Sequence, residues 1–586
     1  MKGLLHKCDY SASAHIACEY KNDFLVEALE QLATGWKGGW NELQRFTQEH
    51  TNENLIVTAP TGSGKTEAGL LWAGDNKCFF VLPLRTAINA MYDRIRGGIL
   101  HNESTDTRIA LLHSEMQAYY LEKSTSEKGK SDEEEPEEEL LTYVTRSKQM
   151  ALPLTIATLD QIFRFTLKYY GYEYILATLS YSKLIIDEVQ MYSPDLLAYL
   201  IYGIKMVIEY GGKVAVITAT LPPFVKDKLY QVMGNDVAER DFSGIKADRH
   251  NVKVMDEPLT SEAIWDVWKK KAGEDSRKFL VICNSVKTAQ RLYRELEELT
   301  QQENVRIHLL HSKFTGDDRK KKEREILEVG ETGRKAHEIW IATSVVEASL
   351  DIDFDYLFTE LLDLFSLFQR MGRVNRKGIK DIDEVNCYVY LQLQDSPLRC
   401  FQSQNPRYRF VDNDIYLLSK EAMETVDGIL SETKKTNLIN EYLSAEKLEK
   451  TGYVKQYEQT YRELEMLNIE EKSTGEMIRD IQTVDIIPAG VYNEHKDVID
   501  TAEQKLRERD AGITEKLQAM EDIRRYVVPV PGYIVYGNKR RSEAVERYIR
   551  IRRNVEIPVV ACEYSSEIGF ERIYKKETER QGSHII

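Results

Sequence analysis

The chain of 586 residues is too long for a single hydrophobic core and indicates roughly three or four domains. Its hydrophobic content of 42% and charged content of 30% are typical of an ordinary globular protein. The net charge of −16 counts against tight non-specific binding of nucleic acid, and without the seven carboxylates of residues 132–139 it would still be −9. A locally basic groove that holds phosphates is nevertheless compatible with this charge.

Several features of the sequence bear on its location. It contains no uninterrupted run of about 18 apolar residues, and its N-terminal stretch is a poor match to a secretory signal. The seven cysteines are scattered, without the spacing of a zinc site. We therefore expect a cytoplasmic protein with free thiols and no membrane partner.

Short apolar runs recur along the chain with helical patterns between them, as in parallel sheets with helical crossovers. They lie at 55–58, 78–82, 108–113, 184–187 and 213–218, and then at 278–284, 306–311 and 338–343. The break at 222–260 predicts two doubly wound α/β lobes. Residues 121–139 are too polar to bury and predict a solvated loop. Beyond residue 400, charged helical stretches such as 446–465 precede a β-like ending at 525–537.

Residues 59–66 (APTGSGKT) follow an apolar run and open a helical pattern, which is the context that a phosphate-binding loop requires. The glycines would let backbone N–H groups approach phosphates at a helix N-terminus. Lys65 would reach the β and γ phosphates of ATP, and the Thr66 hydroxyl would ligate Mg²⁺. A glycine-rich turn with an incidental lysine is the alternative, which the order of strand, loop and helix disfavours. The predicted ATP-binding residues of the loop are Thr61, Gly62, Ser63, Gly64, Lys65 and Thr66.

The apolar run at 184–186 ends in Asp187 and Glu188, at the edge where an α/β sheet binds ligands. Asp187 would hold Mg²⁺, and Glu188 would orient and deprotonate the attacking water. An isolated Asp-Glu pair is usually a solvated strand end. Downstream of a phosphate loop on the same sheet, catalysis is the better interpretation.

Two further motifs resemble those of superfamily 2 helicases. Thr218 and Thr220, in a Thr-Ala-Thr sequence, resemble the motif that couples the two lobes. Residues 369–376 (QRMGRVNR) are similar to the arginine-finger motif of the second lobe, in which Arg373 and Arg376 would face the γ-phosphate. Gln369 and Arg370 match the rest of that motif and are predicted to bind ATP. An exposed basic helix is the alternative for this stretch alone.

Within superfamily 2, the chain resembles the CRISPR-associated helicase of type I systems. The resemblance rests on residues 82–92 (LPLRTAINAMY), 155–161 (TIATLDQ), 187–190 (DEVQ), 342–355 (ATSVVEASLDIDFD) and 366–376 (SLFQRMGRVNR), with a weaker match at 563–570. It implies an α/β fold of two tandem RecA-like parallel-sheet lobes with a helical or mixed C-terminal accessory domain. The expected divisions are an N-terminal helical segment at 1–39, lobes at 40–235 and 236–398, and the accessory domain at 399–586.

The resemblance also implies roles for single residues. Gln44 would read the adenine edge, and Asp351 would sit near the ribose and the arginine fingers. Gln190 stands where the family usually has histidine, and a glutamine can still bridge the lobes by hydrogen bonds. The nucleic-acid cleft would be lined by Arg85, Thr86, Thr158, Asn284, His311 and Thr343, whose side chains suit contacts with backbone phosphates. For each of these, a cap or turn role is the alternative.

Members of this family commonly carry an N-terminal metal nuclease domain with a His-Asp pair. No His-Asp dipeptide occurs in the sequence, and about 40 residues before the first lobe are too few for that domain. Residues 4–14 (LLHKCDYSASA) resemble its final segment, which would leave Asp9 as a single, orphaned ligand. An ordinary amphipathic helix explains them equally well. We expect no nuclease activity from this chain alone.

Together these features predict an ATP- and Mg²⁺-dependent translocase that moves 3′-to-5′ on single-stranded DNA in CRISPR-based antiviral defence. An RNA-guided type I surveillance complex would recruit it, and a separate HD nuclease chain would degrade the unwound target. The alternatives are a superfamily 2 RNA-remodelling ATPase outside CRISPR and an inactive nucleic-acid clamp. The presence of Lys65, Asp187, Glu188 and Arg373 speaks against the inactive clamp.

Overall fold

The computed structural model describes residues 1–36, 38–60, 62–83, 85–113, 116, 137–169, 171–234, 236–245, 248–301, 303, 305–347, 350–393, 413–467, 483–536, 544–552 and 555–574. The chain divides into two compact units. Unit one comprises Met1–Met116, Glu134–Leu259 and Val346–Asp480. Unit two comprises Gln117–Glu133, Thr260–Val345 and Ile481–Ile586.

Unit one contains a seven-stranded sheet in the order β3-β4-β2-β5-β6-β1-β7, and every pair of neighbours in it is parallel. Its strands are β1 (Asn54–Thr58), β2 (Cys78–Leu82), β3 (Ile109–Leu112), β4 (Leu154–Thr158), β5 (Lys183–Asp187), β6 (Lys213–Thr218) and β7 (Val237–Asp241). Strands β5, β6 and β1 are neighbours, so their carboxyl ends meet at one edge of the sheet.

The helices of the first part of unit one are α1 (Lys2–Ser13), α2 (Leu25–Thr34), α3 (Glu42–Glu49), α4 (Lys65–Ala73), α5 (Arg85–Asp93), α6 (Thr105–Arg108), α8 (Glu137–Lys148), α9 (Leu159–Ile162), α10 (Glu173–Leu179), α11 (Pro194–Glu209) and α12 (Pro223–Met233). A π-helix, η1 (Arg94–Ile99), continues α5. Helix α4 is buried along its whole length. A Cβ atom at Gly69 would lie 3.2 Å from Ile185 Cγ2, so this glycine lets α4 approach the sheet closely. The close packing fixes the loop that precedes α4.

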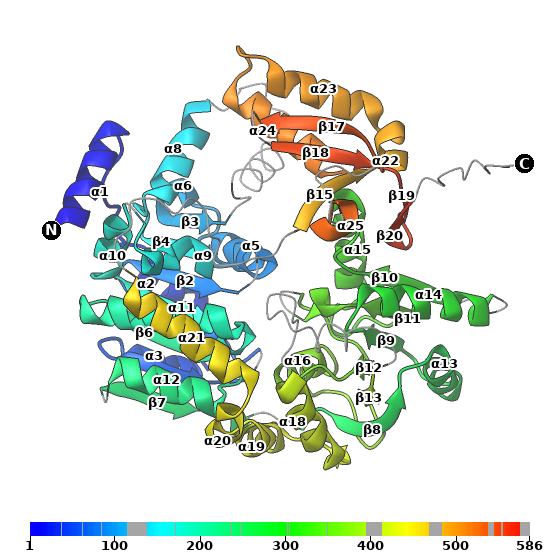
Figure 1. Cartoon of the computed structure of the whole chain (residues 1–586). Coiled ribbons are helices and arrows are strands. Elements are labelled where there is room, and N and C mark those ends of the chain that lie inside the picture. The colour runs from blue at the N-terminus through cyan, green and yellow to red at the C-terminus, as the bar shows by residue number, and fades with distance from the viewer. Residues whose placement is uncertain are drawn as a thin grey trace, which may run out of the picture. The chain divides into compact units, whose positions relative to one another are not determined.

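Unit one also holds a set of strands in the order β12-β13-β8-β14, which belong to a second seven-stranded sheet. They are β8 (Asn251–Pro258), β12 (Tyr356–Glu360), β13 (Cys387–Gln392) and β14 (Gly428–Ile429). The accompanying helices are α16 (Leu364–Met371), α18 (Asn413–Glu424), α19 (Glu432–Tyr442), α20 (Ala445–Glu449) and α21 (Gly452–Met466). Helix α21, yellow in Figure 1, lies alongside α11. Thr460 and Gln456 on α21 both donate hydrogen bonds to the Asp195 carboxylate of α11.

Unit two contains the parallel strands β10-β11-β9 and the C-terminal elements. The strands are β9 (Arg277–Ile282), β10 (Arg306–Leu310) and β11 (His337–Ala342), with helices α13 (Ser261–Lys270), α14 (Val286–Thr300) and α15 (Gly316–Val329). The C-terminal strands β15 (Thr483–Pro488), β16 (Val528–Pro531), β17 (Val545–Arg552) and β18 (Val555–Val560) form a mixed sheet in the order β16-β15-β18-β17. Strands β19 (Cys562–Ser565) and β20 (Gly569–Ile573) form a hairpin, and helices α22 (Ala489–Glu494), α23 (Lys496–Arg507), α24 (Ile513–Arg524) and α25 (Gly532–Tyr536) complete the unit.

The predicted α/β class is confirmed, with two largely parallel sheets and a mixed C-terminal region. The break predicted at 222–260 contains two strands, β7 and β8, and β7 extends the first sheet past residue 235. Both were missed because β7 reads VAERD and β8 carries exposed charged residues, whereas the prediction sought fully apolar runs. Most of the predicted loop at 121–139 lies outside the described residues, although α8 already begins at Glu137.

Two further expectations need correction. The helical stretch predicted at 446–465 consists of two helices, α20 and α21, and the extended backbone of Thr451 separates them. The β-like ending at 525–537 contains the short helix α25 after β16. Among the described helices, none combines the length and apolar composition needed to cross a bilayer.

The packing of α11 yields a stability prediction. A Cβ atom at Gly203 would clash with the Phe163 ring, so Gly203→Ala should overpack the core and destabilise unit one by about 1–3 kcal/mol. The melting temperature, measured by calorimetry, should fall. Gly98→Ala is the matched control, because a Cβ atom there meets open space. Equal melting temperatures for the two variants would contradict the packing described here.

Candidate active site

The phosphate loop lies between β1 and α4. Gly62 (φ 76°) and Gly64 (φ 87°) adopt the left-handed conformation, which costs glycine no steric penalty. Lys65 and Thr66 are the first residues of α4 and both are buried. The loop therefore ends at a helix N-terminus, as a phosphate site requires. Thr61 lies outside the described residues, so its predicted role stays a prediction.

Gln44 lies directly against the phosphate loop. It forms a capping box at the start of α3, in which Asn41 N donates to Gln44 Oε1 and Gln44 N donates to Asn41 Oδ1, both at 3.0 Å. A Cβ atom at Gly64 would clash with Gln44 Nε2. Asn41 Nδ2 also donates to Ser63 O at 2.9 Å. The start of α3 thus buttresses the loop, and Gly64 is required for space as well as for its backbone conformation.

The acidic pair lies at the end of β5. Glu188 has a φ of 52°, an uncommon conformation for a residue with a side chain, and its backbone N–H donates to Asp187 Oδ1 at 2.8 Å. This sharp turn places both carboxylates beside Lys65. Lys65 Nζ lies 3.4 Å from Glu188 Oε1 and 3.8 Å from Asp187 Oδ1. The structure therefore brings together three of the predicted catalytic residues.

Charge and burial act differently on the three groups. Burial and the positive charge of Arg376 oppose protonation of Lys65, but Glu188 and Asp187 outweigh them and raise its pKa. Burial also opposes ionisation of Glu188, yet Lys65 and the hydrogen bond from Gln190 lower its pKa. Burial dominates at Asp187 and raises its pKa to about 7. Glu188 is therefore the carboxylate of the pair that stays ionised.

A chain of hydrogen bonds runs from β6 to Glu188. The Thr218 hydroxyl donates to Gln190 Oε1 at 2.5 Å and accepts from Thr220 N at 3.4 Å. Gln190 Nε2 in turn donates to Glu188 Oε2. Gln369 Nε2 on α16 donates to the same oxygen at 3.3 Å. Gln190 thus joins the predicted coupling motif to the predicted base.

The arginines of the second motif differ in their surroundings. Arg376 Nε lies 3.2 Å from Asp351 Oδ1, and Arg376 Nη1 is buried with no hydrogen-bond partner among the described residues. Arg373 is buried, and its Nε donates to Val346 O at 3.0 Å. Burial and the neighbouring Arg376 lower the pKa of Arg373 to about 10. Arg376 is therefore a cation with an unused buried donor.

Arg370 does not fit its predicted role in ATP binding. Its side chain is fully buried, donates to Glu347 Oε1 at 2.7 Å and contacts the end of β12 through Thr359 Oγ1 at 3.0 Å and Glu360 O at 2.7 Å. We assign Arg370 to anchoring α16. A buried arginine needs such partners, and the sequence pattern alone could not distinguish this use from nucleotide binding.

The predicted nucleic-acid residues have varied positions. Thr158 ends β4 in unit one, and its buried hydroxyl has no hydrogen-bond partner among the described residues. In unit two, Asn284 follows β9 and Thr343 follows β11. Arg85 and Thr86 begin α5, but their side chains lie outside what the structure describes. These positions are compatible with the prediction and do not test it.

His311 departs from its predicted place in the cleft. It is fully buried in unit two, its Nε2 lies 2.9 Å from Ile568 O, and its Nδ1 accepts from Lys313 N at 3.1 Å. Its ring stacks on Phe314 with centroids 4.4 Å apart. Burial lowers its pKa to about 3, so it is neutral. We assign His311 to holding the β19–β20 hairpin, because no ring nitrogen is free for a phosphate.

The N-terminal segment offers no metal site of its own in the described part of the chain. Asp9 is exposed on α1, and no group of three or more His, Cys, Asp or Glu side chains among the described residues could hold an ion. The interpretation of Asp9 as an orphaned nuclease ligand stays a prediction. Whether α1 derives from a nuclease domain stays a prediction.

Asp187 gives a pH-dependent prediction. A carboxyl group whose pKa is raised on folding reduces stability as pH rises from its unfolded value, about 4, to its folded value near 7. Asp187→Asn should therefore raise the melting temperature of the ligand-free chain more at pH 8 than at pH 5. The control is Asp227→Asn, at an exposed position of α12. An equal gain at both pH values would contradict the burial of Asp187 as an acid.

Two known protein families match segments of the chain that contain these motifs. The family described as DEAD/DEAH box helicase matches residues 41–228, and the C-terminal family of the CRISPR-associated nuclease/helicase Cas3 matches residues 275–379. The Cas3 nuclease/helicase of Methanothermobacter thermautotrophicus is 28% identical over 499 residues, covering 82% of this chain and 56% of that protein. The Streptococcus thermophilus Cas3 is 30% identical over 386 residues, covering 58% and 41%. The chain thus spans about half the length of the curated relatives it matches.

Solved structures show the same fold. T. fusca Cas3 with AMPPNP has a TM-score of 0.68 and 16% identity, with 93% of this chain and 70% of that chain covered. A chain of a CRISPR RNA-guided surveillance complex, in a pre-nicking state, has a TM-score of 0.58 and 17% identity, with 91% and 68% covered. The two family matches cover the segment with the phosphate loop and the segment with the arginine motif. In sequence, the chain is therefore similar to DEAD/DEAH box helicases and to CRISPR-associated Cas3 nuclease/helicases.

Proposed function

We propose that this chain hydrolyses ATP to move along single-stranded DNA and to unwind target DNA in CRISPR-based defence. The observation that carries the proposal is the convergence on one carboxylate. The Glu188 carboxylate accepts hydrogen bonds from three side chains. The donors are Lys65 of the phosphate loop, Gln190, which also contacts Thr218, and Gln369 of the arginine motif. Each motif of an ATP-driven motor thereby reaches the same group.

The proposed roles follow from the charge of each group. Backbone N–H groups after Gly62 and Gly64 would hold the phosphates, and Lys65 with Arg376 would neutralise the γ-phosphate. Arg376 suits this role because its buried Nη1 has no partner among the described residues. Glu188, the carboxylate that stays ionised, would accept the proton of the attacking water. Gln369 lies on α16, and its hydrogen bond to Glu188 would couple the position of that carboxylate to the helix.

The residues at the loop also fit Mg²⁺. Thr66 offers a hydroxyl and Asp187 a carboxylate, which are the hard oxygen ligands that this ion takes. A nearby cation would also offset the burial that raises the pKa of Asp187 to about 7. Bound Mg²⁺ would supply charge neutralisation at the β and γ phosphates. Arg373 would support the site from the turn that follows α16, and Gln44 and Asp351 would contact the base and ribose.

The nucleic-acid part of the proposal is supported by the proteins that this chain resembles. The curated relatives are named nuclease/helicases, and one structural neighbour belongs to a surveillance complex. We propose that single-stranded DNA contacts Arg85, Thr86, Thr158, Asn284 and Thr343, and that an RNA-guided complex recruits the chain. We propose the predicted division at 1–39, 40–235, 236–398 and 399–586, with one change. Strand β7 (Val237–Asp241) is counted with the first lobe, because it pairs with β1.

The nuclease step is proposed to come from a partner. Among the described residues, no cluster of His, Cys, Asp or Glu side chains could hold the metal of a nuclease. A separate HD nuclease chain would then act on the strand that this motor exposes. We propose a cytoplasmic location, where such a complex would meet invading DNA.

The proposal predicts the behaviour of the phosphate-loop lysine. Lys65→Ala should lower the ATPase rate with single-stranded DNA by about 10³-fold, because a buried charge at the phosphates is lost. The exposed Lys21→Ala is a control that should keep wild-type turnover. Turnover within about threefold of wild type in Lys65→Ala would contradict the site assignment.

Matched DNA and RNA strands test the choice of substrate. Single-stranded DNA should stimulate the ATPase, and a duplex with a 3′ overhang should be unwound while one with a 5′ overhang should not. Stimulation by RNA instead of DNA would favour an RNA remodeller. An ATPase that neither strand stimulates would favour a clamp whose motor is idle.

A further inference from the structure

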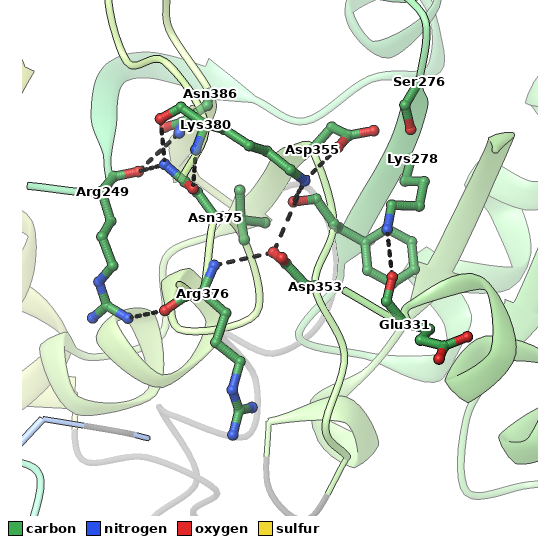
Figure 2. A network of polar contacts seen from close by, with 12 residues as sticks. Arg249, Ser276, Lys278, Glu331, Asp353, Asp355, Asn375, Arg376, Lys380 and Asn386 are labelled. Atoms are coloured by element: carbon green, nitrogen blue, oxygen red, sulfur yellow. Dashed lines mark hydrogen bonds and ion pairs between the residues drawn. The ribbon is translucent and has the colours of Figure 1, made fainter. Parts of the chain in front are cut away.

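Two residues outside every recognised motif contact the turn that carries the candidate arginine fingers. Arg249 and His250 immediately precede β8. Arg249 Nη1 donates to Arg376 O at 3.0 Å, as Figure 2 shows. His250 Nε2 lies 2.7 Å from Met371 O and 3.1 Å from Val374 O. The backbone of the turn at 371–376 is therefore held at its start, middle and end by one dipeptide.

The turn itself has an unusual path that needs such support. Asn375, between the two arginines and fully buried, has a φ of 45°, which costs an ordinary residue about 1 kcal/mol or more. Its Nδ2 donates to Arg249 O and to Lys380 O, both at 3.1 Å (Figure 2). Arg376 N donates to Asp353 Oδ1 at 3.0 Å. This conformation sets the direction in which the Arg376 side chain leaves the backbone.

Helix α19 anchors the dipeptide from behind. Glu432 Oε1 accepts from Arg249 Nη2 at 2.5 Å and from Lys435 Nζ at 2.9 Å. Lys435 Nζ also lies 3.0 Å from His250 Nδ1. Arg249, His250 and Lys435 are all at most 4% exposed. A continuous polar network thus joins the first turn of α19 to the arginine-bearing turn.

The network fixes the proton on His250. An ammonium group can only donate, so Lys435 donates to Nδ1 and the ring proton lies on Nε2, where it donates to Met371 O. Burial and the charges of Lys435 and Arg249 hold the pKa of His250 well below its usual range, which keeps the ring neutral. Burial opposes ionisation of Glu432, but Lys435 and Arg249 outweigh it and lower its pKa to about 2. Burial lowers the pKa of Lys435, although Glu432 opposes that shift. The hydrogen-bond geometry therefore assigns the ring proton of His250 to Nε2.

Such a network is an inefficient way to increase folding stability. It buries two cations against one carboxylate, and apolar side chains of similar volume often stabilise a core more than buried ion pairs do. Its donors instead end on the backbone of the turn. We propose that Arg249, His250, Glu432 and Lys435 are positioning residues that orient the Arg373–Arg376 turn for ATP hydrolysis. The proposal rests on the proposed ATPase function, and none of the four residues would touch the nucleotide.

The test compares two replacements of His250 in the full chain. His250→Phe removes the donor to Met371 O, whereas His250→Gln keeps an N–H near the position of Nε2. With single-stranded DNA, His250→Phe should lower kcat about 10- to 100-fold and leave KM for ATP within about twofold, because a misplaced turn affects hydrolysis more than binding. His250→Gln should restore most of kcat.

A second pair of variants on α19 separates positioning from folding. Lys435→Met should lower kcat by about tenfold with little change in KM, because His250 loses the donor that orients it. Lys434→Met is the matched control at an exposed position of the same helix and should keep wild-type kcat. Melting temperature and binding of a fluorescent ADP analogue are measured for every variant.

The outcomes distinguish the positioning role from the ATPase function on which it rests. An inactive wild-type chain would overturn the ATPase function and the positioning role with it. An active wild type with unchanged kcat in His250→Phe and Lys435→Met would overturn only the positioning role. So would equal losses in His250→Phe and His250→Gln that follow the loss of melting temperature and of ADP binding, because folding would then explain them.

Discussion

The half-buried carboxylate of Glu188 is the constraint on which the site depends. Its backbone turns sharply at the end of β5, in a conformation that few residues with side chains adopt. The turn lets Lys65, Gln190 and Gln369 reach one carboxylate from three separate segments. This one carboxylate thus contacts the loop that would hold phosphates, the segment that would couple the lobes and the helix that precedes the arginine turn.

Positively charged side chains lie around this carboxylate. Arg376 lies close enough to Lys65 to oppose its protonation, and Arg376 keeps a buried donor without a partner among the described residues. Two cations in that arrangement favour an anion between them. The network around Arg249 and Lys435 lies one layer further out. Arg249 donates to the backbone of Arg376, and Lys435 contacts the ring of His250. The organisation suits a site that is completed by its substrate.

Much of this was predictable because the motifs are contiguous in sequence and lie at strand ends. The phosphate loop and the acidic pair carry their context with them, so their elements were predicted correctly. Prediction failed for residues whose role depends on the side chains packed around them. Arg370 and His311 look like ligand contacts, but both side chains are fully buried and hydrogen-bonded to neighbours. His250 and Lys435 carry no pattern, since they are 185 positions apart and meet only through β8 and α19.

The central claim is that Glu188 activates water while the other groups hold the nucleotide. Glu188→Gln tests it most directly, because the substitution keeps shape and hydrogen-bonding capacity but removes the base. Binding of ATP and its single-turnover hydrolysis would be measured on the same sample with single-stranded DNA. The account predicts near-wild-type ATP binding with hydrolysis slowed by about 10³-fold or more. Hydrolysis within about tenfold of wild type would contradict it.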